Sequence, residues 1–281
     1  MFQINWKIKA FLYRVLFFLK VERALFFIQK KITKSANINI DKVNENWKYH
    51  LKYLQSFNSI KVLEFGAGKS LEQNIFFSYQ LNDKLFQTVI DVSNMLDFDL
   101  FNQASDQVAT ILKKNRKTFV QSIDEIKKNY NIEYIAPCDI EKIERSGLKF
   151  DACISTTTLE HLPLSKLKNH FISLKKIVKK NGIISSLIDY SDHYCHTDKK
   201  IGPLNFLQFS EEDWKKYNTP YLFQNRLRHQ DYRNLFLQMD YEIVEEKQGT
   251  IGALPKTISD KFDINNKETN ILWGHFLLKS K

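Results

Sequence analysis

The chain has 281 residues, is 43% hydrophobic and 26% charged, and carries a formal net charge of +10. This composition excludes an intrinsically disordered chain, and the length allows a large core without disulfides or a structural metal. The cysteines at 138, 153 and 195 form no paired spacing, which favours a reducing compartment. We therefore expect a globular cytoplasmic protein.

The N-terminal segment mixes apolar and basic side chains, as in FLYRVLFFLKVERALFF at 11–27. Its longest apolar run, 15–19, is far shorter than the ~20 residues that a membrane span needs. No small-residue cleavage site follows that run, so a signal peptide is not expected either. The pattern predicts an amphipathic basic helix over 1–40. Packing on its own domain, homodimer formation and peripheral contact with the inner face of the membrane are all open for it.

Apolar strand patterns and amphipathic helix patterns alternate through 41–281. Strands are expected at 60–65, 86–91, 132–137, 150–156, 183–189, 241–246 and 270–280. Helices are expected at 47–57, 71–81 and 164–182. The last two strands have no strong helix between them. This order predicts an α/β fold, with a doubly wound, Rossmann-like, mostly parallel seven-stranded sheet and one antiparallel edge strand. The segments 93–131 and 190–232 are expected to be insertions.

The loop VLEFGAGKS at 62–70 ends with Gly-Lys-Ser, as a P-loop does, but begins with an apolar strand, an acid and Gly-x-Gly, as a cofactor loop of another kind does. A P-loop is excluded because Leu63 stands where its first glycine belongs and Glu64 would lie beside the phosphates. The dinucleotide fingerprint is excluded because Leu71 replaces its third glycine. Gly66 and Gly68 still allow the backbone to approach a ligand closely. The loop therefore predicts a ligand site of another kind.

Acidic residues follow three of the predicted strands. Glu64 can face an ammonium group, Asp91 can accept both hydroxyls of a ribose, and Asp139 lies where an adenine amino group would be. The carboxyl ends of parallel strands are where such sheets bind ligands. These positions predict a site for a nucleoside that carries an amino-acid moiety.

Four segments stand in order, namely VLEFGAGKS, VIDVS at 89–93, APCDI at 136–140 and FDACISTTTLEHLP at 150–163. With them the sequence resembles the class I S-adenosylmethionine-dependent methyltransferases, over roughly 60–190. The resemblance implies a methyltransferase with S-adenosylmethionine as cofactor. Lys69 departs from the small residue usual in the loop, and the gap between Asp91 and Asp139 is long for the family. The cofactor-binding positions that it implies are Glu64, Gly66, Ala67, Gly68, Asp91, Val92, Asp139 and Thr156.

Methyl transfer from a sulfonium needs mainly alignment, and a general base helps a hydroxyl acceptor. Candidate catalytic residues are His161, after the fourth strand, and Asp192 and His193, which follow the fifth strand and should lie over the methyl group. A polar loop with local hydrogen bonds is the alternative. A metal site from Asp192, His193, His196 and Asp198 has suitable ligand types but matches no specific spacing, so no metal is assigned.

The segment 190–232 is also rich in arginine and aromatic residues. A guanidinium group suits a carboxylate or phosphate, although a helix start with surface charges is the alternative. Aromatic rings there are expected to stack on a sugar face, at Tyr190, Tyr194, Phe206, Phe209 and Trp214. The expected substrate-binding residues are His196, Arg226, Arg228 and His229.

The function expected is O-methylation of a sugar or related small-molecule precursor of a bacterial surface glycan, because 190–232 looks similar to methyltransferases associated with surface polysaccharides. The alternatives are an RNA or protein methyltransferase, and a non-enzymatic membrane-associated scaffold that retains the fold. Nucleic acid is not an expected partner, since the chain has no RNA-binding module. The intact acids Glu64 and Asp91 argue against a scaffold.

Overall fold

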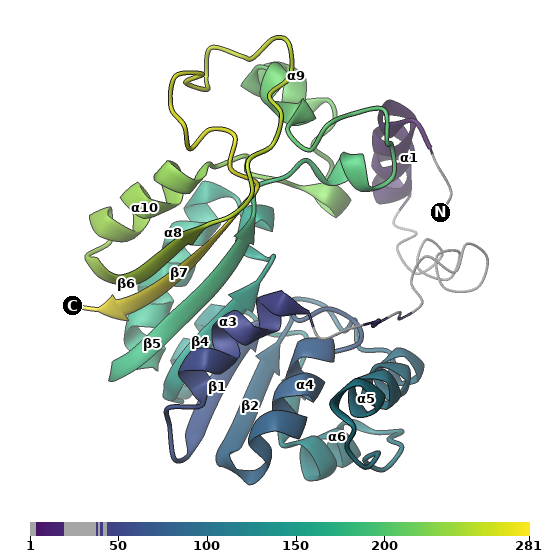
Figure 1. Cartoon of the computed structure of the whole chain (residues 1–281), viewed down its shortest axis with the longest axis vertical. Coiled ribbons are helices and arrows are strands. Elements are labelled where there is room, and N and C mark those ends of the chain that lie inside the picture. The colour runs from purple at the N-terminus through teal and green to yellow at the C-terminus, as the bar shows by residue number, and fades with distance from the viewer. Residues whose placement is uncertain (1–3, 20–37, 39, 42–43) are drawn as a thin grey trace.

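The computed structural model describes residues 4–19, 38, 40–41 and 44–281 (Figure 1). Its α-helices are α1 Trp6–Phe18, α3 Glu45–Leu54, α4 Glu72–Leu81, α5 Phe98–Leu112, α6 Ile123–Tyr130, α7 Ile140–Ser146, α8 Leu164–Ile177, α9 Glu211–Lys215 and α10 His229–Gln238. Its strands are β1 Ile60–Phe65, β2 Leu85–Ile90, β3 Ile132–Ile135, β4 Phe150–Thr156, β5 Val178–Asp189, β6 Tyr241–Gln248 and β7 Trp273–Ser280.

The strands form one seven-stranded sheet in the order β3-β2-β1-β4-β5-β7-β6. The pairs β2–β3, β1–β2, β1–β4 and β4–β5 are parallel, whereas β7 is antiparallel to both β5 and β6. The predicted α/β sheet with a single antiparallel strand is confirmed. That strand is β7, and it lies between β5 and the outermost strand β6. The carboxyl ends of the parallel strands therefore meet at one edge, where ligands bind in such sheets.

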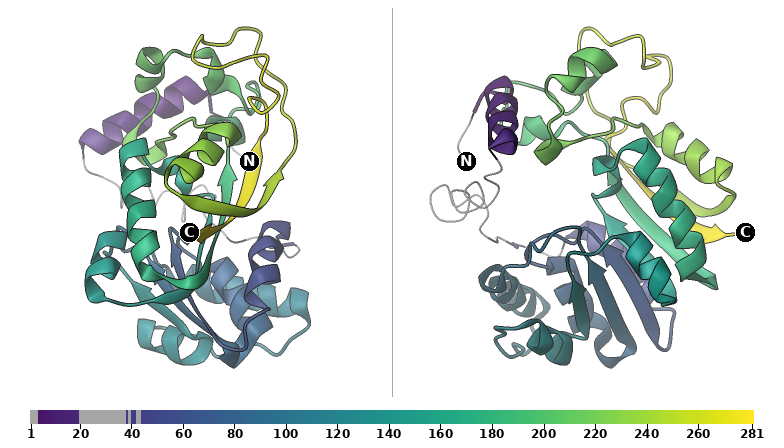
Figure 2. Two further views of the ribbon diagram at one scale, coloured as in Figure 1. Left: turned by 90° about the vertical axis from the view of Figure 1, so that its left-hand side faces the viewer. Right: turned by 180° about the vertical axis from the view of Figure 1, so that it is seen from behind.

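Helices cover both faces of the sheet, as expected for a doubly wound fold (Figures 1 and 2). The helices α3 to α6 bury one core, with Trp47 of α3 against Phe76 of α4. The helices α7, α8 and α10 bury the other, with Phe171 of α8 against Phe236 of α10. The predicted insertion 93–131 contributes α5 and α6 to the first core.

The boundary between α8 and β5 differs from the sequence prediction. The helix expected over 164–182 ends at Ile177, because Val178 has extended backbone and pairs with Phe150 of β4. The strand then continues to Asp189, with a register shift between Phe150 and Ala152. The polar residues that suggested a helical end instead occupy the exposed start of a long strand.

Above the strand ends lies a cap, defined here as residues 190–228 and 249–272, against which α1 packs (Figure 1). Its core buries Trp6 of α1 together with Leu204, Phe206 and Trp214. The Trp6 ring lies 4.6 Å from the ring of Tyr217. The predicted insertion 190–232 thus forms most of the cap, and α1 packs on it.

The helix α1 presents two different faces. Trp6 and Ala10 are buried against the cap, whereas Phe11, Phe18 and Leu19 are 66%, 75% and 64% exposed. Residues 20–37 of the predicted helix lie outside the described residues. Contact of this segment with a membrane or a second subunit stays a prediction. Among the helices that the structure describes, none is long and apolar enough to cross a membrane.

Candidate functional site

The loop between β1 and α4 turns through left-handed glycines. Gly66 and Gly68 have φ of 73° and 78°. A Cβ on Gly66 would lie 2.5 Å from Cγ2 of Thr158, so this position has no room for a side chain. Leu71, at the position of the missing third glycine, has φ of 51° and immediately precedes α4. The loop thus brings its backbone against the turn after β4.

A cavity of about 470 Å³ lies at the carboxyl ends of β1 and β2 and is called here the cofactor cavity. Its volume is that of a small-ligand pocket. Four of the eight predicted cofactor residues line it, namely Gly66, Asp91, Val92 and Asp139. Its other lining residues are Phe65, Ile90, Cys138, Ile140, Glu141, Thr158, His161, Leu162, Lys166 and His170.

Asp91 and Asp139 differ in what their carboxylates already bind. Asp91 is 7% exposed, and burial raises its pKa against the opposing effect of the Val92 and Ser93 backbone N–H groups. Oδ1 of Asp139 accepts a 2.8 Å hydrogen bond from the Lys142 backbone and caps α7. Both acids line the cofactor cavity, and Asp91 is the more buried of the two, whereas Asp139 is exposed and also caps a helix.

Glu64 does not line the cofactor cavity. Its oxygens accept hydrogen bonds from Gln73 Nε2 at 3.0 Å and Asn74 Nδ2 at 2.7 Å, and burial raises its pKa to about 7. These contacts tie β1 to α4, in place of the expected contact with an ammonium group. Ala67, Gly68 and Thr156 also lie outside the lining.

A buried polar chain, which the sequence did not suggest, continues from Gln73. Thr156 Oγ1 donates to Gln73 Oε1 at 2.8 Å and contacts His50 Nε2 at 3.0 Å. His50 Nδ1 contacts Ser185 Oγ at 2.8 Å, and the same oxygen contacts His275 Nε2 at 2.8 Å. Because Thr156 donates its only hydrogen to Gln73, His50 donates from Nε2 and accepts at Nδ1. Burial lowers the pKa of His50 to about 3 and that of His275 to about 4.

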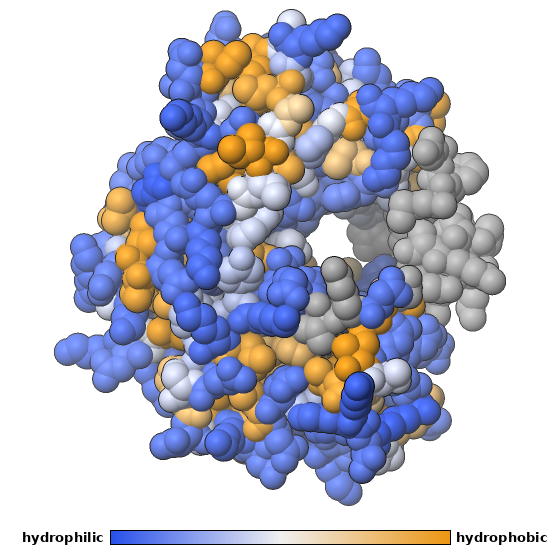
Figure 3. Space-filling model, viewed as in Figure 1, coloured by the Kyte–Doolittle hydropathy of each residue, from blue (hydrophilic) through white to orange (hydrophobic). Residues whose placement is uncertain are grey.

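A second cavity, of about 320 Å³, lies between the end of β5 and the cap and is called here the acceptor cavity. Thr157 lines it, while the next residue, Thr158, lines the cofactor cavity, so one turn separates the two. Thr157 has φ of 49°, a strained conformation of the kind found at functional sites. In the space-filling view an opening lies between the cap and the sheet (Figure 3). The remaining lining residues are Asn46, Leu187, Ile188, Asp189, Ser191, Cys195, His196, Pro203, Thr250, Leu272 and Trp273.

Three imidazole rings lie in a row between the cavities. His161 lines the cofactor cavity, and its ring centre is 4.9 Å from that of His193. The His193 ring is in turn 5.5 Å from that of His196, which lines the acceptor cavity. His161 Nδ1 lies 2.7 Å from the Phe223 carbonyl, which can only accept, so this nitrogen carries the hydrogen and Nε2 the lone pair. Burial lowers the pKa of His161.

Asp189 is a residue at this end of the sheet that the sequence analysis did not single out, and it lines the acceptor cavity. Its Oδ2 lies 3.3 Å from His193 Nε2, and its Oδ1 accepts from the Ser191 backbone at 2.8 Å. It is the last residue of β5, and the signal that selected Asp91 would have selected it too, since each acid ends a predicted strand. Trp273, by contrast, comes from the antiparallel strand, and no local signal marked it.

The structure gives Asp192 and Asp198 other roles than those expected. Asp192 is buried and accepts from the Tyr194 backbone and from Asn205 Nδ2, both at 2.9 Å. Asp198 accepts from the backbones of Trp6 and Lys200, both at 3.0 Å. Both carboxylates hold cap backbone in place. Among the described residues, neither carboxylate lies with His193 and His196 in a group that could hold a metal ion.

Arg226 and Arg228, which were expected to bind the substrate, are buried inside the molecule and bind groups of the chain itself. The Arg226 guanidinium donates to Glu211 Oε1 at 2.7 Å and to the carbonyl groups of Phe206 and Phe209. Arg228 donates to three carbonyl groups, those of Thr269, Tyr190 and Ile271. Their hydrogen bonds satisfy backbone acceptors that an irregular segment leaves without partners.

His229 is fully buried as well, at the start of α10. Its Nε2 lies 2.5 Å from Glu246 Oε1 and its Nδ1 lies 3.0 Å from the Tyr190 hydroxyl, which makes it a structural link to β6. The aromatic rings expected to stack on a sugar are mostly core residues. Those no more than 2% exposed are Tyr190, Tyr194, Phe206 and Trp214.

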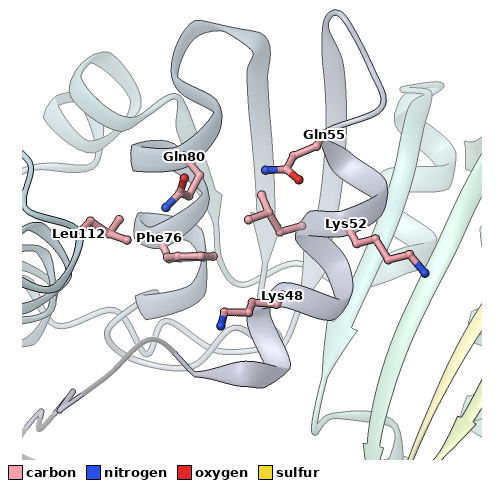
Figure 4. A pocket seen from close by; sticks show the side chains of 7 residues that line it. Lys48, Lys52, Gln55, Phe76, Gln80 and Leu112 are labelled. Carbon is pink, nitrogen blue, oxygen red and sulfur yellow. The ribbon is translucent and has the colours of Figure 1, made fainter.

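A third cavity, of about 420 Å³, lies between α3, α4 and the end of α5, away from the strand ends (Figure 4). Leu51, Phe76 and Leu112 form its apolar part. Lys48 is paired with Glu45 at 2.8 Å, and Lys52 points away from the cavity and is paired with Glu245 at 3.0 Å. The two lysines among its described lining residues are already paired with carboxylates, so no chemistry is assigned to it.

No model of a protein family and no curated protein matches the sequence. Among solved structures, the 1,6-didemethyltoxoflavin-N1-methyltransferase of Burkholderia thailandensis is similar, with 11% identity, 94% of this chain and 88% of that chain covered, and a TM-score of 0.50. That structure holds 1,6-didemethyltoxoflavin and S-adenosylhomocysteine. TehB of Haemophilus influenzae is 16% identical over 91% of this chain, which spans 66% of TehB, with a TM-score of 0.45. The chain has the fold of the Burkholderia enzyme.

Proposed function

We propose that the protein is an S-adenosylmethionine-dependent methyltransferase that O-methylates a small polar acceptor. The observation that carries the proposal is the pair of cavities at the carboxyl ends of the strands, separated by the turn at Thr157 and Thr158. One cavity contains a buried acid and a glycine loop, and the other is lined by hydroxyl, amide and imidazole groups. The fold shared with a methyltransferase supports the proposal, and the residues that line the two cavities supply the groups that bind the cofactor and the acceptor.

The residues present fit the cofactor. Asp91 follows β2 and faces the cofactor cavity, where its carboxylate can accept both ribose hydroxyls. Because Gly66 has no Cβ, the loop can lie directly against Thr158. Val92 lines the same cavity and offers an apolar contact for the adenine ring. S-adenosylmethionine, when bound, supplies a methyl group that is already activated on a sulfonium.

The acceptor cavity favours a sugar-sized molecule. Its volume of about 320 Å³ is at the small end for ligand pockets. Trp273 offers an aromatic face, and Asn46, Ser191 and Thr250 offer hydrogen-bonding groups around it. That combination of one flat apolar wall and several polar groups suits a sugar ring, and a monosaccharide precursor of a surface glycan belongs to this class.

His161 is the base that we assign to the transfer. Its Nε2 carries the lone pair, because Nδ1–H donates to the Phe223 carbonyl. Its lowered pKa keeps the ring neutral at pH 7, the state that a base requires. As the methyl carbon bonds to the acceptor oxygen and leaves the sulfur, the hydroxyl proton passes to Nε2, and a neutral thioether is released.

Calorimetry with S-adenosylhomocysteine tests the proposal. The wild-type chain should bind one equivalent, and Asp91→Ala should weaken binding by about 1–3 kcal/mol through lost hydroxyl partners. The matched control is Asp260→Ala, an exposed acid outside both cavities, which should leave the affinity unchanged. A wild-type protein that binds no S-adenosylhomocysteine would end the methyltransferase assignment.

A further inference from the structure

We propose that Asp189, His193 and His196 bind one divalent transition-metal cation at the wall of the acceptor cavity. The site uses an acid that the sequence analysis passed over and excludes Asp192 and Asp198, whose oxygens hold backbone groups. Binding of the cation does not depend on the methyltransferase assignment. A role for the cation in methyl transfer does rest on it.

The geometry of the three ligands is the first argument. One ligand atom from each of Asp189, His193 and His196 lies within 4.8 Å of the other two. A tetrahedral Zn²⁺ with bonds of about 2.1 Å separates its ligands by about 3.4 Å, so the site closes by roughly 1 Å on binding. Two imidazoles and one carboxylate leave coordination positions open, as catalytic Zn²⁺ and non-haem Fe²⁺ sites do.

The second argument is a buried carboxyl group beside the same histidine. Glu160 is 3% exposed, and neither of its oxygens makes a hydrogen bond of regular geometry with a described residue. It forms a second group with His161 and His193 whose ligand atoms lie within 4.8 Å of one another. The donors near this carboxyl are the backbone N–H groups of Glu160 and Asp189, and no described side chain offers it a positive charge, which a cation at His193 would supply.

The proposed site lies where a cation could act on the hydroxyl group of the acceptor. Asp189 and His196 line the acceptor cavity, whereas His161, next to His193, lines the cofactor cavity. A cation between them would polarise an acceptor hydroxyl and lower its pKa, so that the proton passes more readily to His161 Nε2. The ligand set therefore deepens the proposed function from methyl transfer to metal-assisted methyl transfer.

Metal titration of the full chain tests the site. After treatment with EDTA and desalting, the protein should bind one Zn²⁺ per chain by calorimetry and by elemental mass spectrometry, and Co²⁺ should give the visible absorption of a low-coordinate site. His193→Ala and His196→Ala should lower Zn²⁺ affinity at least roughly 100-fold, and Glu160→Gln by roughly 10-fold, as the loss of an outer-shell partner does. Asp198→Asn is the control from the same loop and should bind as the wild type does.

The outcomes separate this inference from the proposed function. His196 is exposed, so His196→Ala should unfold at the wild-type temperature and report on ligation alone. Absence of saturable Zn²⁺ binding, or equal binding by the wild type and both histidine variants, would overturn the metal site. S-adenosylhomocysteine binding measured on the same metal-free sample would show whether the methyltransferase assignment stands when the metal site falls.

Discussion

The cofactor side of the sheet and the cap use similar charged residues for opposite purposes. Asp91 is directed into a cavity, where its oxygens are available to a ligand. Arg226 and Arg228 of the cap are directed into the protein, where carbonyl groups and a carboxylate of the chain itself occupy them. The difference follows from backbone structure. Strands satisfy their own carbonyl groups, whereas an irregular cap needs side-chain donors to do so.

Removing an arginine of the cap is expected to have the largest effect on the free energy of unfolding. Arg228→Ala leaves the carbonyl groups of Thr269, Tyr190 and Ile271 buried without donors, and should lower the free energy of unfolding by about 3–5 kcal/mol in urea titrations. Arg116→Ala is the control, since Arg116 forms an exposed ion pair and should change stability by less than ~1 kcal/mol. If both variants lost equally little free energy of unfolding, Arg228 would not be a structural residue, and ligand binding would again be its expected role.

A change of pH is the next test of the comparison, because desolvation lowers the pKa of three histidines in the sheet and its helices, none of which belongs to the cap. The pKa values of His50 and His170 are lowered to about 3 and that of His275 to about 4, from 6.5 in the unfolded chain. Protons then bind the unfolded state more strongly, so stability falls as the pH drops below 6.5.

Glu64 opposes this trend, since its pKa is raised from 4.5 to about 7 and its contribution to stability is lost as the pH rises through that window. At pH 5 each of these three histidines lowers the stability by about 2 kcal/mol and Glu64 offsets about 2 kcal/mol, so these four groups together contribute a loss of about 3–4 kcal/mol between pH 7 and pH 5. Urea unfolding at both pH values measures it. A protein equally stable at pH 5 and pH 7 would contradict the burial of these rings as neutral groups.

The smallest expected effect concerns the turn between the cavities. Thr157 has φ of 49°, which costs a threonine about 1–2 kcal/mol. Thr157→Gly should relieve this strain and, after the loss of backbone entropy, stabilise the fold by about 0.5–1 kcal/mol. Thermal unfolding compares it with Thr157→Ala, which keeps the strain and should show no gain. A glycine variant no more stable than the alanine variant would mean that the turn is not strained.

The parts of the molecule that could be predicted are those governed by local pattern. The apolar run that ends at Gly66 predicted β1, and the acid at the end of the next apolar run predicted Asp91 as a site residue. Strand periodicity and chain order then determine which strand ends lie together. The insertion after β5 could not be resolved in the same way. Nothing local distinguishes an arginine that binds a ligand from one that binds carbonyl groups, as Arg228 does.

The residues that the sequence analysis missed differ in whether a local pattern could have identified them. Asp189 ends a predicted strand as Asp91 does, so the rule that selected Asp91 would also have selected Asp189. His50, Ser185 and His275 come together from α3, β5 and β7, and only the sheet order reveals their contact. Long-range pairing of this kind leaves no trace in the spacing of a single sequence.

A crystal structure of the complex with S-adenosylhomocysteine would test the central claim most directly. The account predicts ribose hydroxyls on Asp91, the adenine beside Val92, and the sulfur at the turn of Thr157 and Thr158, facing the acceptor cavity. A complex with the ligand in the α3–α4 cavity, or with the sulfur directed away from the His161–His193–His196 row, would contradict the division of the strand ends into a cofactor side and an acceptor side.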